Sequence, residues 1–131
     1  MTAASVGRDA KGMDGNVVTA GIAASTTIYK GTMVGYNSSG YLEPKDASGN
    51  VFAGVALEDG VGTTTAGETE IKIARKGAFE MVFGSAAITY LGDEFYVVDD
   101  QTIATSGTHK AGRACRYENS GKIFIDIGGY C

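Results

Sequence analysis

The 131-residue chain has no tryptophan, one proline, one histidine and two cysteines. Two cysteines are too few for a disulfide framework, and Cys115 and Cys131 do not have the spacing of metal ligands. No apolar run approaches the ~20 residues that a membrane helix requires. The N-terminus also lacks the basic and then apolar pattern of a secretion signal. These absences predict a protein with no membrane partner, no metal and no disulfide scaffold.

Leucine is scarce, and this scarcity indicates the fold class. The chain contains only 3 Leu, against 10 Val, 9 Ile and 13 Thr. β-Branched side chains lose rotamers in a helix and fit the pleated surface of a sheet. The 20 glycines are about twice the usual ~7% and are suited to tight turns between short strands. The composition therefore predicts an all-β protein.

Catalytic and nucleic-acid-binding patterns are lacking too. The 15 acidic and 11 basic residues give a net charge of −4, whereas nucleic-acid binding depends on clustered cations. The single histidine, His109, is expected to be a solvated residue in the loop 105–111, with no serine or cysteine beside an acid to form a triad. We therefore predict no enzymatic activity, no catalytic residues, no cofactor and no nucleic-acid partner.

Residues 1–28 contain no aromatic side chain, whereas all 12 Phe and Tyr residues lie between positions 29 and 130. This contrast predicts an extended N-terminal arm, 1–28, followed by a β domain, 29–131. One interpretation of the arm is a disordered tail. The other is a segment that orders on a partner by strand addition. In the second case the apolar contacts with the partner would come from four residues: Val6, Val17, Val18 and Ile22.

Two halves of the domain carry similar strand patterns. Residues 31–42 align with 92–103, each beginning with glycine and alternating in hydropathy, and an Ala-Gly strand follows in each half at 53–56 and 111–114. The run 51–57 is nearly all apolar, which indicates a strand buried on both faces. The repeat predicts a small β-barrel or sandwich with pseudo-twofold character.

Four stretches together resemble the capsid decoration (cement) proteins of tailed bacteriophages: 29–41, 52–56, 75–80 and 92–100. The resemblance implies a small β-barrel or β-tulip-like fold and a structural role. Such a protein is made in the host cytoplasm and binds the outer surface of the capsid, often as a homotrimer. There it bridges and stabilises major capsid protein subunits, and its N-terminal arm takes part in attachment.

Two alternatives to that role remain open. One is another virion or cell-surface structural module, such as a tail, fibre or adhesin domain, with carbohydrate binding through surface tyrosines as a variant. The other is an enzyme whose site the sequence does not reveal. The terminal Cys131 is also open to three interpretations: a free thiol, a disulfide with Cys115, or a disulfide with a neighbouring subunit.

Overall fold

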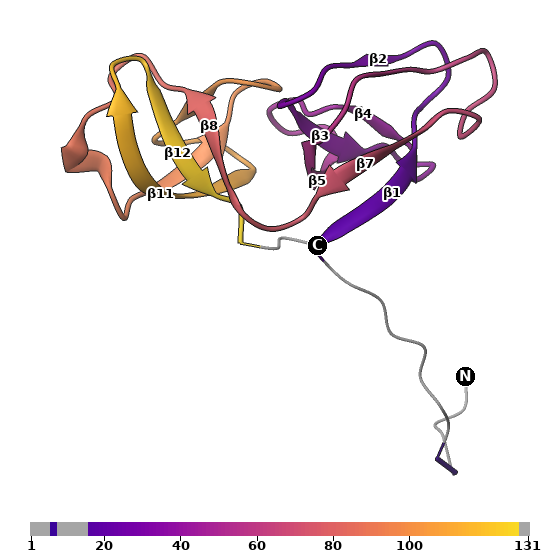
Figure 1. Cartoon of the computed structure of the whole chain (residues 1–131), viewed down its shortest axis with the longest axis horizontal. Coiled ribbons are helices and arrows are strands. Elements are labelled where there is room, and N and C mark those ends of the chain that lie inside the picture. Colours follow the sequence, from indigo (N-terminus) through magenta and orange to yellow (C-terminus); the bar gives the residue numbers. More distant parts are fainter. Residues whose placement is uncertain (1–5, 8–15, 129–131) are drawn as a thin grey trace.

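The computed structural model describes residues 6–7 and 16–128, which fold into short strands and one 3-10 turn. The all-β prediction is confirmed. Two lobes lie side by side (Figure 1). The first lobe, residues 17–74, holds β1 (Val17–Gly21), β2 (Thr27–Ile28), β3 (Met33–Tyr36), β4 (Leu42–Pro44), β5 (Val51–Ala56), β6 (Gly60–Val61) and β7 (Glu70–Ala74). The second lobe, residues 78–126, holds β8 (Ala78–Val82), η1 (Ile88–Tyr90), β9 (Glu94–Val97), β10 (Ile103–Ala104), β11 (Lys110–Asn119) and β12 (Lys122–Asp126).

The two lobes repeat one strand order. The main sheet of the first lobe runs β1-β7-β5-β3-β4, and that of the second runs β8-β12-β11-β9-β10, with every ladder antiparallel. β1 and β8 begin at positions 17 and 78, and β3 and β9 begin at 33 and 94, so both pairs are 61 residues apart. The internal repeat predicted from the sequence is therefore present as a repeat of topology. The first lobe adds a two-stranded sheet, β2-β6, that has no counterpart among the described strands of the second.

Equivalent backbone hydrogen bonds hold the two copies in the same form. The Gly31 N–H donates to the Ala56 carbonyl in the first lobe, and the Gly92 N–H donates to the Ala114 carbonyl in the second, both at 2.8 Å. In each case a glycine ahead of the second shared strand of the repeat (β3 or β9) is joined to the fourth (β5 or β11). The similarity of the two halves therefore extends from sequence to main-chain geometry.

The sequence predicts a small β-barrel or a β-tulip-like domain, and a closed barrel is not observed among the described residues. β1 and β4 lie at the two ends of one sheet, and β8 and β10 lie at the ends of the other. Single parallel bridges, Ile22–Leu42 and Val82–Thr102, link the segments at those ends. β4 has three residues and β10 has two, which is too short for the continuous ladder that closure of a barrel requires.

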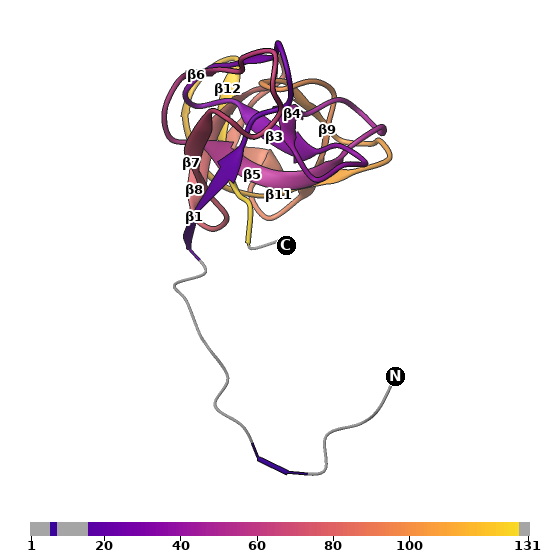
Figure 2. The ribbon, with the colours of Figure 1, turned by 90° about the vertical axis from the view of Figure 1, so that its right-hand side faces the viewer.

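β3 and β5 form the wall between the lobes. Met33, Phe52 and Val55 on one face belong to the second core, together with Phe95, Ile123 and other side chains of the second lobe. Val34, Ala53 and Ala56 on the other face pack into the first core. All of β5 after Val51 is buried, so the prediction of a strand buried on both faces is confirmed. Figure 2, viewed from the first-lobe end, shows β3 and β5 in front of the strands of the second lobe.

Candidate functional site

Part of the segment expected to be an arm belongs to the first lobe. Val17 and Val18 lie in β1 and pair with Ala74 and Ile73 of β7. Ile22 is fully buried in the first core, and so is Ile28. The boundary expected after residue 28 therefore needs correction, because residues 17–28 already form strands of the domain. The backbone ladder and small apolar side chains hold this segment without aromatic anchors.

The four residues expected to grip a partner differ in accessibility. Val6 is 79% exposed and Val17 is 43% exposed. Val18 is half-buried against the first core. Ile22 has no exposed surface, so in this fold its side chain is unavailable to another protein. The structure thus leaves Val6 and Val17 as accessible members of the set, and most residues between them lie outside the described part of the chain.

Cys115 lies in β11, exposed, with its thiol 3.6 Å from the Phe124 carbonyl oxygen. Burial raises the pKa of this thiol, and the negative charge of Asp126 raises it further. A thiol with a raised pKa is protonated at neutral pH and reacts slowly. Cys131 lies outside the described residues, so the pairing of the two cysteines stays a prediction.

A buried lysine joins the two lobes. Lys45 follows β4 in the first lobe and is 1% exposed. Its ammonium donates to the Asp46 carbonyl at 2.7 Å and to the Asn50 carbonyl at 2.8 Å. Its third contact is Nδ1 of His109 in the second lobe, at 2.8 Å. The expectation that His109 is a solvated loop residue is corrected: its ring is half-buried and contacts Lys45.

Asn50 and Asp46 support this lysine. The buried Asn50 side chain donates to Glu43 and to the Pro44 carbonyl, each at 3.1 Å. The Asp46 carboxylate lies 3.7 Å from the Lys45 ammonium. Burial lowers the pKa of Lys45, and the charge and hydrogen bond of Asp46 offset this only in part. No sequence signal marks Lys45, because it lies in a polar stretch that looks like an ordinary loop.

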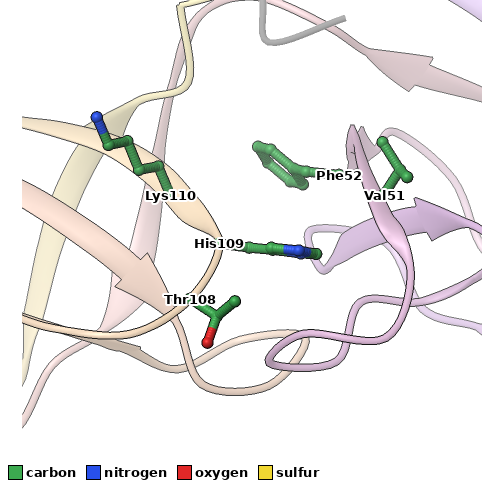
Figure 3. A pocket seen from close by; sticks show the side chains of 5 residues that line it. All are labelled: Val51, Phe52, Thr108, His109 and Lys110. Atoms are coloured by element: carbon green, nitrogen blue, oxygen red, sulfur yellow. The ribbon is translucent and has the colours of Figure 1, made fainter.

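A pocket of about 370 Å³ opens beside this contact. Val51 and Phe52 line it from the first lobe, and Thr108, His109 and Lys110 line it from the second. Figure 3 shows the His109 ring projecting toward the strand that carries Val51 and Phe52, while the Lys110 ammonium points away from that ring. Lys110 instead pairs with Glu94 at 3.2 Å. Two of the five lining side chains, Val51 and Phe52, are apolar, and the other three bring a hydroxyl, an imidazole and an ammonium group.

Apolar side chains are also exposed on each of the two lobes. Tyr29 and Val61, beside and within the β2-β6 sheet, are 62% and 64% exposed. In the second lobe Ile88 and Leu91, within and next to η1, are 69% and 38% exposed. Positions 88–91 are the repeat equivalents of 27–30, so Tyr29, Ile88 and Leu91 come from the same segment of the repeat, whereas Val61 comes from β6, opposite Thr27. We call the two pairs the first and second apolar surfaces.

The described residues contain no cluster of three or more His, Cys, Asp or Glu side chains that could hold a metal ion. In the described part of the chain, no helix is long and apolar enough to cross a membrane.

Comparison with solved structures finds a similar fold. The crystal structure of the head fiber gp8.5 N base in bacteriophage phi29 superposes with a TM-score of 0.54 and 17% sequence identity. The match covers 86% of this chain and 94% of that one. No protein-family model matches the sequence, and no curated protein matches it. At this identity the likeness is one of fold, and it covers both lobes because it extends over most of each chain.

Proposed function

We propose that this chain is a structural module of a bacteriophage head that binds the outer surface of the capsid as a decoration (cement) protein. In this role it bridges and stabilises neighbouring major capsid protein subunits. The fold likeness to the base of a phage head fiber carries the proposal, because a similar fold over most of both chains occurs in a structural protein of a phage head. The sequence resemblance to decoration proteins points to the same location.

The two apolar surfaces fit a bridging role. Each lobe presents its own exposed apolar side chains: Tyr29 and Val61 in the first, Ile88 and Leu91 in the second. A protein with two similar surfaces can contact two neighbouring copies of a lattice subunit. Two linked contacts bind more tightly than either contact alone, because the second forms at high effective concentration. A homotrimer, which we also propose, would multiply these contacts.

The same likeness supports a second candidate, the base of a head fibre. Such a base attaches to the capsid and carries an appendage, so it needs affinity for the capsid but no stabilising effect on it. The observation that favours this candidate is the fiber-base description of the similar structure.

Titration of expanded, undecorated capsids with the purified chain tests the proposal. Cosedimentation and cryo-electron microscopy report binding, and capsid melting reports stabilisation. A decoration protein adds density and raises the melting temperature, whereas a fibre base adds density alone. No density at saturation would overturn both candidates.

Variants show whether both apolar surfaces are used. Tyr29→Ser with Val61→Thr alters the first surface, and Ile88→Thr with Leu91→Ser alters the second. Val98→Thr is the matched control, since Val98 is 45% exposed but lies outside both surfaces. We expect either double variant to weaken binding and abolish stabilisation, while the control behaves as wild type. Unchanged binding and stabilisation in both double variants would exclude these surfaces as the attachment sites.

A further inference from the structure

We propose that the contact between Lys45 and His109 is an acid-sensitive latch that holds the two lobes together at neutral pH and releases when His109 takes up a proton. Lys45 belongs to the first lobe and His109 to the second, so the contact crosses the junction. The argument rests on how many hydrogens the 2.8 Å gap between the two nitrogens can hold.

A single hydrogen fits between Nζ and Nδ1. Lys45 already donates to two backbone carbonyls, of Asp46 and Asn50, which accept hydrogen bonds only. A protonated Lys45 therefore directs its third N–H at Nδ1, and the proton of a neutral His109 ring lies on Nε2. A protonated ring carries hydrogens on both nitrogens and has no acceptor left. Two donors then face each other, and the contact is lost.

The second positive charge is costly because the lysine is buried. Lys45 is 1% exposed, and charges interact more strongly away from bulk water. The charged groups placed around the pair are few. Asp46 lies 3.7 Å from the lysine, Glu43 reaches the site only through Asn50, and Lys110 is engaged with Glu94. One adjacent carboxylate balances one cation at this site, which leaves the second cation uncompensated.

Protons can reach the ring. His109 is half-buried and lines the pocket at the junction, so the imidazole is in contact with solvent (Figure 3). Histidine side chains change charge between about pH 5 and 8. Because His109 is the single histidine of the chain, any transition in that range that depends on a histidine must come from His109.

Nearby hydrogen bonds report the state of the junction. The Met33 N–H of the first lobe donates to the Asp100 carbonyl of the second at 2.7 Å, and the Val97 N–H donates to the His109 carbonyl at 2.9 Å. The first bond crosses the junction and the second holds the loop that carries His109. Both should lose protection when the latch opens, whereas bonds inside one lobe, such as Gly31 to Ala56, should not.

Amide hydrogen exchange of the full chain between pH 7.5 and 5.5, corrected for the intrinsic pH dependence of exchange, tests the latch. We expect the protection factor of the Met33 amide to fall about fivefold over this range, the part of a tenfold preference for the unprotonated ring that an ordinary histidine realises above pH 5.5. His109→Asn keeps an acceptor oxygen but takes up no proton, so its protection should not change with pH. Lys45→Met should also remove the pH dependence, and its urea midpoint at pH 7.5 shows whether the variant is folded.

Two results would overturn the proposal. One is a wild-type chain whose Met33 protection is the same at both pH values. The other is a His109→Asn variant that retains the wild-type fall. Asp100 does not imitate the effect, because burial and Asp99 raise the pKa of its carboxyl. A raised pKa in the folded state favours folding more as the pH falls, which is the opposite sign.

Discussion

Gly54 and Gly112 occupy the same place in the two lobes. A Cβ on Gly54 would lie 2.2 Å from the Ala74 carbonyl oxygen, and a Cβ on Gly112 would lie 2.2 Å from the Asp126 carbonyl oxygen. Their φ angles, +152° and +155°, are nearly equal. In each lobe the fourth strand of the repeat passes so close to the fifth that no side chain fits between them.

This geometry predicts the effect of alanine at either position. Gly54→Ala and Gly112→Ala should each destabilise the chain by about 2 kcal/mol or more, since a Cβ adds both overpacking and backbone strain. Urea unfolding measures the loss. Gly84→Ala is the matched control, because nothing lies within 4 Å of its Cβ position. Equal stability of all three variants would contradict the close approach.

The position of Met33 predicts that the two lobes unfold together. It is fully buried and extends from β3 of the first lobe into the second core. Met33→Ala should cost about 2–5 kcal/mol by leaving a cavity. We expect calorimetry to show one transition with equal calorimetric and van't Hoff enthalpies, because the wall strands belong to both cores. Ile88→Ala, at an exposed position, should change stability by less than about 0.5 kcal/mol. Two separate transitions would show that the lobes fold independently.

Two N-terminal deletions distinguish an arm from the domain. Removal of residues 2–15 leaves β1 in place and should preserve stability while weakening capsid binding, if the segment before β1 is an attachment arm. Removal of residues 2–25 also deletes β1 and Ile22, and loss of that buried side chain alone costs about 2–5 kcal/mol. Circular dichroism melting and capsid cosedimentation measure the two effects. Unchanged capsid affinity after the shorter deletion would exclude the arm.

Cys115 should react slowly with thiol reagents despite its exposure. In a Cys131→Ser background we expect maleimide labelling at pH 7.5 to be slower than that of a free cysteine peptide and to rise with pH, because the raised pKa reduces the thiolate fraction. Asp126→Asn removes one cause of the shift and should speed the reaction. Asp93→Asn, in an exposed turn, is the control. Labelling as fast as in the peptide would contradict the raised pKa.

Much of the fold followed from side-chain patterns. Ile71 and Ile73 alternate in the sequence with Glu70 and Lys72, a pattern that indicates one inward face, and both isoleucines are buried in the first core. The apolar run 51–57 predicted a doubly buried strand, which β5 is. These predictions succeeded because they depend on local periodicity, which the strand geometry converts directly into faces.

The junction could not be predicted in the same way. Lys45 and His109 are 64 residues apart and meet only because the residue after β4 and the residue before β11 face each other at the junction of the lobes. The N-terminal boundary was misplaced for a related reason. Val17 and Val18 are held by backbone pairing with β7, and this contact does not depend on aromatic side chains.

The repeated strand order creates a problem of folding fidelity. In a newly made chain, β7 and β12 are similar strands, and each has two similar candidates, β1 and β8, for the same edge. An exchange of β1 and β8 would leave the backbone pairing unchanged, since Val18 lies opposite Ile73 and Phe79 lies opposite Ile125 in equivalent registers. The side chains differ in volume: β1 presents Val18 and Ala20 where β8 presents Phe79 and Met81. A close-packed interior cannot accept that exchange. The difference in side-chain volume therefore selects the correct edge strand for each lobe.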